Sequence, residues 1–262
     1  GWTNYDKLIQ YVTFDVTKYL KEGVNTIGAE IGNGWFIMNN DHYTFAFPAF
    51  MPPNPNPYHA YGKSLVFAMC LEVEYKDGTK DVMTADDTFK VAEHMVTVSN
   101  VYGSEYIDGR KAQIGWNTIA FDDSKWEKAK IVAEEDEPKG ELQNQTQPPI
   151  KVIHTYEGKY LHDYADKESG EIRKIYDFSG MLEVKVKGKA GDEIHFLAAE
   201  KLSPEGDVDQ MAKNWMMIDN CITYIVGKDD EWETCKLVFT YFAGRFMGVE
   251  AFQNQMLLKL VK

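Results

Sequence analysis

Apolar and polar residues alternate with a period of two along much of the chain, which predicts β-strands with one buried face. A first alternating run lies within residues 63–91 and is followed by Asp77-Gly78, a pair typical of a hairpin turn. The apolar positions that share one face of this run are Leu65, Phe67, Met69, Leu71, Val73 and Tyr75. We therefore predict a half-buried antiparallel hairpin in this segment.

The same pattern recurs over residues 181–202, in the second half of the chain. Charged residues separate the apolar positions of a first run, and a turn at 190–192 leads to a second run with the same spacing. The apolar positions are Leu182, Val184, Val186, Ile194, Phe196 and Ala198. This spacing predicts two more half-buried strands in an antiparallel arrangement.

Helical patterns are scarce. Residues 15–25 fit one short turn, with Thr17 as its N-cap and Gly23 as its stop, and residues 122–131 fit another that opens at Asp123 or Ser124. The sequence contains no series of long amphipathic helices and no repeat of fixed period. We therefore predict an all-β fold of the sandwich or jelly-roll type.

Two stretches interrupt the strand pattern. Residues 134–152 combine charge, Gln and Asn with Pro148-Pro149 and predict an irregular, solvated segment. We place a linker at 141–149, between one domain at 1–140 and a second at 150–262. The proline-rich residues 45–62 predict a long loop in the first domain, and such loops often bind ligands.

The charge of the chain excludes several classes of partner. The formal net charge is −13 and the sequence pI is near 4.9. Nucleic acids and anionic membranes attract clustered Lys and Arg, so we expect neither as a partner. No apolar run approaches the length of a membrane span.

The cysteines offer no disulfide or metal pattern. Cys70, Cys221 and Cys235 have no CxxC spacing and no histidine nearby in the sequence. We predict buried thiols, with Cys70 inside an alternating strand.

The segment "IGNGWF" at residues 31–36 is rich in glycine, but it does not fit a phosphate-binding loop. The third glycine of a dinucleotide fingerprint is absent, and Trp35 and the residues after it are unsuited to a helix N-terminus that cradles phosphate. Gly32 and Gly34 instead predict a turn between a strand and a loop. Trp35 belongs either to the core or to an exposed platform for the apolar face of a sugar ring.

Polar residues next to this turn could take the hydroxyl groups of such a sugar. The segment "NNDHY" at 39–43 clusters oxygen ligands but lacks the alternating acids of an EF-hand loop. The candidate carbohydrate-binding residues are Trp35, Asn33, Asn40, Asp41 and His42.

The segment "YGSEYIDGR" at 102–110 contains the most suggestive charged group. In a strand, Asp108 and Arg110 point the same way, while Glu105 faces the opposite side. One interpretation is a structural ion pair with a turn. The other is a general acid and base pair.

Several of these segments together resemble the non-catalytic N-terminal part of bacterial α-L-rhamnosidases, glycoside hydrolase family 78. Residues 1–36 are similar to that family's Gly-Trp-Thr-x-Tyr, Asp-Val-Thr, Leu-x-x-Gly-x-Asn and Gly-x-Gly-Trp-Tyr series, in the same order. "YGSEYIDGR" resembles its Tyr-x-Gly-Glu-x-Tyr-Asp-Ala-Arg segment, with matches at Tyr102, Glu105, Asp108 and Arg110. "GWNTIAFDDSKWEKA" resembles a signature of galactose-binding-like jelly rolls.

The second half of the chain carries the rest of the resemblance. Residues 175–208 are similar to the family's Asp-Phe-Gly-Gln-Asn and Ala-Glu-x-Leu-x-x-x-Gly run. Ser179-Gly180 departs from the family's Gly-Gln-Asn, and "FAGRF" keeps Arg245 but replaces a His-Gly-Phe-Arg-Tyr pattern.

The resemblance implies two consecutive antiparallel β-sandwich domains, the first galactose-binding-like and shortened at its start, the second concanavalin-like. The family's catalytic domain is a helical barrel, so we expect this chain to hold no catalytic residues and to be inactive alone. The implied partners are that catalytic domain, in the same polypeptide, and rhamnose-containing glycans. Calcium is the cofactor to test, because a sandwich in this region binds rhamnose with calcium in some relatives. The implied location is the bacterial periplasm or the extracellular space.

Two other functions remain open. A purely structural or interaction module fits two acidic sandwiches equally well. A glycosidase built on the sandwich itself would use Glu105 and Asp108 and needs two carboxyl groups about 5–9.5 Å apart in an open cleft.

Overall fold

The structure is a computed structural model that describes residues 3–34, 36–37, 61–62, 64–100, 104–148, 151–152, 154–155, 157–165, 167, 172–177, 181–210, 220–241, 244–251 and 259–260. The chain divides into two compact units. Unit 1 comprises Gly1–Ile37, His59–Glu93 and Gln113–Pro149, and unit 2 comprises Met38–Tyr58, His94–Ala112 and Ile150–Lys262. The two units are described separately.

The described residues form strands and three short 3₁₀ helices, so the predicted all-β class is confirmed. Within these ranges, no helix is long and apolar enough to cross a membrane. The finer expectation, two consecutive antiparallel sandwiches joined at 141–149, stays a prediction.

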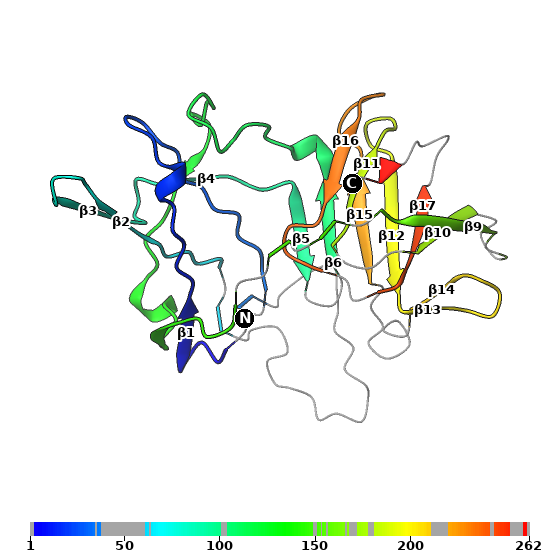
Figure 1. Cartoon of the computed structure of the whole chain (residues 1–262), viewed down its shortest axis with the longest axis horizontal. Helices are drawn as coiled ribbons and strands as arrows, with labels where there is room; N and C mark the ends of the chain where they lie inside the picture. The colour runs from blue at the N-terminus through cyan, green and yellow to red at the C-terminus, as the bar shows by residue number, and fades with distance from the viewer. Residues whose placement is uncertain are drawn as a thin grey trace. The chain divides into compact units, whose positions relative to one another are not determined.

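Unit 2 is built on a seven-stranded sheet (Figure 1). In spatial order its strands are β5 (Val96–Asn100), β6 (Ser104–Asp108), β15 (Cys221–Ile225), β12 (Glu193–Ala199), β17 (Phe246–Ala251), β10 (Ile172–Asp177) and β9 (Lys159–Ala165). Neighbours are antiparallel except β6 and β15, which pair in parallel. The sheet is therefore mixed rather than purely antiparallel, because strands from the first half of the sequence add to its edge.

A three-stranded sheet shares its core with the larger one. It consists of β16 (Glu233–Lys236), β11 (Glu183–Val186) and β18 (Lys259–Leu260). Its Val184, Val186 and Cys235 belong to the same buried cluster as Ile194 and Phe196 of β12. Burying one such apolar side chain contributes about 1.5–3 kcal/mol, so this shared core stabilises unit 2.

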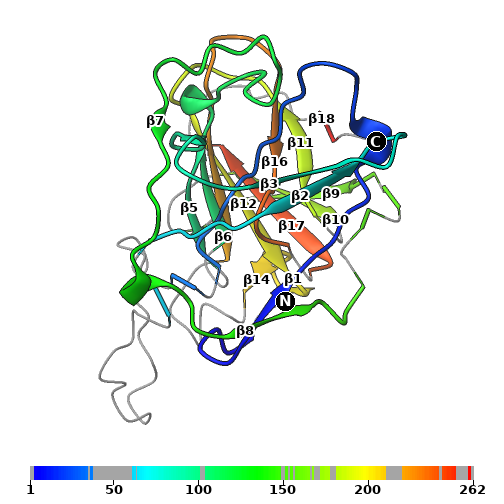
Figure 2. The same cartoon turned by 90° about the vertical axis from the view of Figure 1, so that its left-hand side faces the viewer.

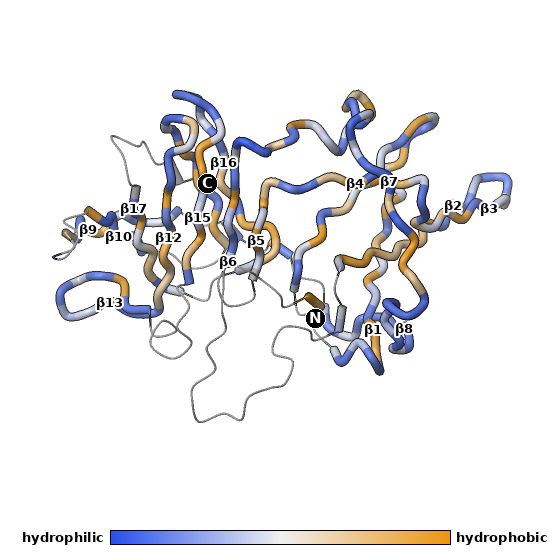
Figure 3. The backbone as a smooth tube through the Cα atoms, turned by 180° about the vertical axis from the view of Figure 1, so that it is seen from behind, coloured by the Kyte–Doolittle hydropathy of each residue, from blue (hydrophilic) through white to orange (hydrophobic). Residues whose placement is uncertain are grey.

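The predicted alternation in this region is confirmed. Leu182, Val184 and Val186 are buried, as are Ile194, Phe196 and Ala198, whereas their neighbours other than Ala199 are exposed or half-buried. Figure 3 shows hydrophobic and hydrophilic positions succeeding each other along β12 and β15. Gly191 turns the chain between the two runs with a φ of +94° and leads from the smaller sheet to the larger.

The other face of the large sheet carries a smaller cluster. The short strands β13 (Lys201–Leu202) and β14 (Val208–Asp209) pair with each other. Val208 packs there with Ile175 and Ala199. We call this side the outer face.

The described residues of unit 1 form three pairs of strands. These are β1 (Leu8–Tyr11) with β8 (Glu141–Asn144), β2 (Cys70–Glu74) with β3 (Lys80–Thr84), and β4 (Lys90–Val91) with β7 (Glu127–Lys128). The first two pairs are labelled in Figure 2. The hairpin predicted around Asp77-Gly78 is confirmed, since Glu74 pairs with Lys80 and Gly78 has a φ of +86°.

Burial in unit 1 differs from the sequence prediction. Leu71 and Val73 are half-buried, but β3 is exposed along its length. Cys70 is exposed, so the prediction of a buried thiol there was wrong. Cys70 falls on the polar side of the alternation, opposite Leu71 and Val73, which explains its exposure.

The short helices match the sequence only in part. A 3₁₀ helix, η1 (Thr17–Tyr19), forms where a turn was predicted, but Thr17 is its first residue and the Asp15 carboxylate accepts from the Thr17 N–H. The segment 122–131 forms a turn and β7 instead of a helix, because its backbone pairs with β4. The other 3₁₀ helices are η2 (Gly109–Lys111) and η3 (Glu134–Asp136).

The segment expected to be irregular contains a strand. β8 pairs in parallel with β1, from Leu8 and Glu141 to Tyr11 and Asn144. All four residues of β8 are exposed, in line with the solvated composition. The strand forms because β1, far away in the sequence, supplies its hydrogen bonds.

Candidate functional site

The proposed sugar-binding residues are mostly not covered by the structure. Trp35, Asn40, Asp41 and His42 lie outside the described residues. Asn33 is half-buried, and its carbonyl oxygen accepts from the N–H of Ile37 at 3.2 Å. The sugar-binding set therefore stays a prediction.

The turn predicted next to Asn33 is present. Gly34 has a φ of +51°, and a Cβ placed there would meet no atom within 4 Å. The conformation, rather than crowding, favours glycine at this position.

The charged segment 102–110 supplies the best-defined polar cluster, and β6 holds it in the large sheet of unit 2. Glu105 points to the inner side of β6, as does Ile107 of the hydrophobic core. The Glu105 carboxylate is completely buried. It accepts hydrogen bonds from the backbone N–H groups of Val238, Phe239 and Thr240, and from the Thr240 hydroxyl at 3.0 Å.

These donors explain how a carboxylate is accommodated in the core. A buried charge is costly unless hydrogen bonds replace its hydration. Three consecutive N–H groups and one hydroxyl provide that replacement, so Glu105 anchors residues 238–240 to β6.

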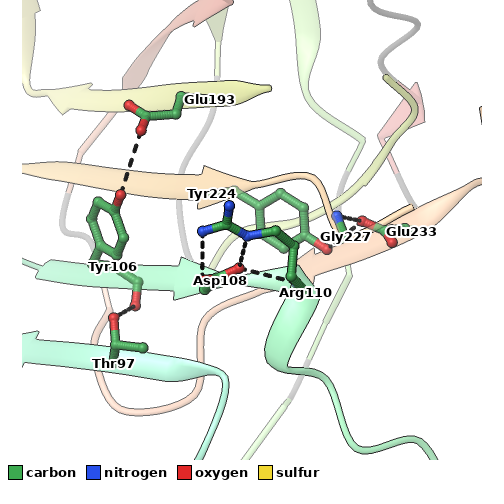
Figure 4. Close-up of polar contacts among 8 residues, drawn as sticks. All are labelled: Thr97, Tyr106, Asp108, Arg110, Glu193, Tyr224, Gly227 and Glu233. Atoms are coloured by element: carbon green, nitrogen blue, oxygen red, sulfur yellow. Dashed lines mark hydrogen bonds and ion pairs between the residues drawn. The ribbon is translucent and has the colours of Figure 1, made fainter. Parts of the chain in front are cut away.

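Asp108 and Arg110 form an ion pair at the end of β6 (Figure 4). Nε and Nη2 of Arg110 donate to the two carboxylate oxygens of Asp108 at 2.8 and 2.9 Å. The Asp108 carboxylate also accepts from the Arg110 backbone N–H and so caps η2. The hydrogen bonds from Arg110 lower the pKa of Asp108 below its usual value.

Close packing of the backbone surrounds this ion pair. A Cβ on Gly109 would lie 2.7 Å from the carbonyl oxygen of Ile225 and 2.8 Å from the Tyr224 hydroxyl. That hydroxyl donates to Glu233, which also accepts from the Gly227 N–H at 2.7 Å (Figure 4). Burial raises the pKa of Tyr224, and the nearby Glu233 adds to the effect.

Tyr106 lies on the outer face of β6, between Glu105 and Asp108 in the sequence. Its hydroxyl donates a long hydrogen bond of 3.5 Å to Glu193 of β12, and its carbonyl oxygen accepts from Thr97 of β5 (Figure 4). Partial burial, together with the charge of Glu193, raises the pKa of Tyr106. Tyr106 therefore connects β6 to β12 through its hydroxyl group and to β5 through its carbonyl oxygen.

This geometry does not suit acid and base catalysis by Glu105 and Asp108. Glu105 has no exposed surface and is occupied by four donors. A general acid needs a raised pKa, whereas Arg110 lowers the pKa of Asp108. The cluster instead holds strand ends and backbone segments together.

Sequence reasoning missed two groups on the outer face. Arg173 is bound by both Asp207 and Glu250. His195 lies next to Cys221 and Thr223. No local pattern indicates either group, because Arg173 and His195 are 26 to 77 residues away from these partners in the sequence. Across the described ranges, no three His, Cys, Asp or Glu side chains form a group that could hold a metal ion.

The fold and the buried Glu105 anchor define an all-β module organised around one mixed sheet. The "Alpha-L-rhamnosidase N-terminal domain" family matches residues 1–154, and the "Bacterial alpha-L-rhamnosidase concanavalin-like domain" family matches residues 175–262. The chain belongs to the α-L-rhamnosidase N-terminal domain family and carries a concanavalin-like domain after it. The resemblance inferred from the sequence motifs is thereby confirmed.

Individual relatives agree with this assignment. The chain is 28% identical to an α-L-rhamnosidase of Streptomyces avermitilis over 97% of its own length, and 31% identical to one of Formosa agariphila over 78%. It spans only 23% and 20% of the length of these two curated relatives.

Solved structures show the same fold. A Streptomyces avermitilis α-L-rhamnosidase complexed with L-rhamnose is similar with a TM-score of 0.73 and 26% identity, over 95% of this chain and 22% of that one. An α-L-rhamnosidase from Dictyoglumus thermophilum has a TM-score of 0.72 and 23% identity, over 100% of this chain and 27% of that one.

Proposed function

We propose that this chain is a non-catalytic accessory portion of an α-L-rhamnosidase-like glycoside hydrolase. The observation that carries the proposal is the consecutive match of both parts of the chain to non-catalytic rhamnosidase domains. The relatives are several times longer, which supports a catalytic domain elsewhere in the same polypeptide as the main partner. In this role the chain positions the catalytic domain and contributes to substrate binding.

The proposed architecture is two β-sandwich domains. The core shared by the seven-stranded and three-stranded sheets supports a sandwich in unit 2. The three strand pairs of unit 1 support a second β-rich domain.

Absence of hydrolysis by the chain alone is the test of the non-catalytic role. The purified chain should not release p-nitrophenol from p-nitrophenyl α-L-rhamnoside, because Glu105 is inaccessible and Asp108 is paired with Arg110. Turnover that disappears in both Glu105→Gln and Asp108→Asn would overturn this role and favour a glycosidase built on the sandwich.

Carbohydrate binding is the second part of the proposal. A rhamnose-containing glycan would stack on Trp35, while Asn33, Asn40, Asp41 and His42 take its hydroxyl groups, with calcium as the cofactor to test. Trp35→Ala should weaken L-rhamnose binding at least tenfold in isothermal titration with calcium chloride. Trp232→Ala, at a tryptophan whose exposed fraction is 47%, is the matched control and should leave binding unchanged.

A purely structural or interaction module is the competing function, and the anchoring geometry of Glu105 favours it. That function predicts no heat with L-rhamnose in the unsubstituted chain, with or without calcium. The same titration therefore decides between the two. We further propose a bacterial periplasmic or extracellular location, which fractionation of the source cells would test.

A further inference from the structure

A thiol, an imidazole and a carboxylate lie in line on the outer face of the large sheet of unit 2. Cys221 begins β15, and His195 and Glu193 belong to the neighbouring strand β12. Leu197 pairs with Cys221 and His195 pairs with Thr223. Paired residues of antiparallel strands project to the same face, so Cys221 and His195 are diagonal neighbours.

The arrangement is that of a nucleophile next to its base, with a carboxylate at ion-pair rather than hydrogen-bond distance from the base. The Sγ of Cys221 lies 3.5 Å from Nδ1 of His195, and Nε2 of His195 lies 3.7 Å from Oε2 of Glu193. The Thr223 hydroxyl lies 3.2 Å from the same Nδ1. A proton on Nε2 faces Glu193, and Nδ1 is then the acceptor that faces both the thiol and the hydroxyl.

Nearby carboxylates are placed to stabilise the imidazolium that forms when His195 accepts a proton. On the strands beside β12, Thr223 of β15 and Glu250 of β17 pair with His195. From β6, one strand further away, Tyr106 donates to Glu193. The cations near these carboxylates are Arg173 of β10, which is bound by Glu250 and Asp207, and Arg110, which interacts with Glu193. Glu193 at 3.7 Å and Glu250 on the neighbouring strand are therefore placed to stabilise an imidazolium on His195.

We propose that Cys221 is an activated thiol, a modification site for small soft electrophiles such as hydroperoxides. His195 Nδ1 takes the thiol proton, and Glu193 stabilises the resulting imidazolium. The thiolate sulfur then attacks one peroxide oxygen and the O–O bond breaks. Cysteine is oxidised to sulfenic acid and the peroxide is reduced. The leaving group, hydroxide from hydrogen peroxide or alkoxide from an organic hydroperoxide, takes the proton from His195 to form water or an alcohol.

The other two cysteines are natural controls. Cys70 is exposed, and within the described ranges its thiol has no hydrogen-bond contact with a histidine. Cys235 is fully buried, and burial raises the pKa of its thiol. Cys221 is half-buried, so a small reagent can reach it, although its thiol also has the Ile222 carbonyl oxygen as a weaker acceptor at 3.6 Å.

The test is a short iodoacetamide pulse on the native, unsubstituted chain, followed by peptide mass mapping of all three cysteines. An unassisted thiol with the reference pKa of about 8.5 should react roughly 50-fold more slowly at pH 6.5 than at pH 8.5. Alkylation of Cys221 should slow by only roughly 5-fold or less, because His195 takes the thiol proton and keeps more thiolate at the lower pH. If alkylation slows between pH 8.5 and pH 6.5 as much at Cys221 as at Cys70, the proposal is overturned.

Variants locate the cause of the effect. His195→Gln should slow alkylation of Cys221 at pH 6.5 by roughly 10-fold or more, and Glu193→Gln should slow it less. His162→Gln is the matched control, since His162 is a half-buried histidine of the same sheet whose Nε2 faces the Gly206 carbonyl oxygen. Equal rates of Cys221 alkylation in His195→Gln and His162→Gln would contradict the proposal. If a variant fails to fold, the pH dependence measured on the unsubstituted chain still tests it.

The final measurement addresses the hydroperoxide itself. Pretreatment with hydrogen peroxide should block alkylation at Cys221 before Cys70, and dithiothreitol should restore it, because sulfenic acid is reversible. If hydrogen peroxide blocks alkylation of Cys70 first, or of both thiols together, the assignment of the electrophile is overturned.

Discussion

Oε1 of Glu105 lies 2.7 Å from the backbone nitrogen of Thr240, a residue 135 positions further along the chain. The same carboxylate accepts from the N–H groups of Val238 and Phe239. A strand from the first half of the sequence is thus tied to the segment that follows β16. The motif around Glu105 is therefore an internal anchor of unit 2.

Glu105→Gln should lower the free energy of unfolding by about 2–4 kcal/mol, because the amide group brings N–H donors to a site already lined with donors. Urea denaturation followed by tryptophan fluorescence measures the change. Glu183→Gln is the control, since Glu183 is half-buried on β11 with Lys236 at 3.6 Å, and it should cost about 0.5 kcal/mol or less. Similar costs for the two variants would contradict the anchoring role.

Gly109→Ala should destabilise unit 2 by about 3 kcal/mol, because the new methyl group collides with the carbonyl oxygen of Ile225. Gly191→Ala is the matched variant, since Gly191 has a φ of +94° but open space around it. It should cost about 1–2 kcal/mol, from backbone strain alone. Thermal unfolding of both variants compares the cost of a steric collision with the cost of backbone strain. A smaller loss of stability in Gly109→Ala than in Gly191→Ala would refute the close packing.

Ser104→Gly should stabilise the protein by about 1 kcal/mol. Ser104 has a φ of +69°, and its buried hydroxyl has no hydrogen-bond partner among the described residues. Removing the strain and the unpaired hydroxyl outweighs the flexibility that glycine adds to the unfolded chain. Ser99→Gly, at a buried strand position, should instead destabilise by about 1 kcal/mol. A loss of stability in Ser104→Gly would argue against strain at this position.

The ion pair of Asp108 and Arg110 should make stability depend on pH in the acidic range. Arg110 lowers the pKa of Asp108 in the folded state, so the stabilisation is complete above the unfolded pKa of about 3.9 and is lost as the pH falls through the folded value. The side chain of Arg110 is 52% exposed, so solvent screening keeps this contribution small.

Urea titrations of the unsubstituted chain and Asp108→Asn at several pH values measure this contribution. Their difference in stability should be constant above about pH 5 and shrink below about pH 4. Arg110→Met should remove most of the difference, because it removes the partner. A difference that grows on acidification would contradict the sign of the pKa shift.

Local sequence patterns predicted many of the strands. Leu182, Val184 and Val186 alternate with charged residues and are buried, and Asp77-Gly78 closes the expected hairpin. These features depend on side chains within a few positions of each other, so the chain's own periodicity is enough to predict them.

Partners distant in sequence could not be predicted in the same way. β6 pairs in parallel with β15, and β8 forms only because β1 lies beside it. The polar motif 102–110 identified Glu105, Asp108 and Arg110, but nothing in it indicated that residues 238–240 would surround Glu105. Likewise, no pattern in the sequence joined Cys221 to His195.

The sequence by itself determined the all-β class, the buried faces of β11 and β12, and the relation to rhamnosidases. The tertiary structure alone decided that Glu105 is an internal anchor, that Asp108 is held by Arg110 beside closely packed glycines, and that a thiol meets an imidazole on the outer face. The physical reason is that alternation acts through neighbours along one strand. Burial and hydrogen bonding of a charged group, by contrast, depend on which distant strands pack around it.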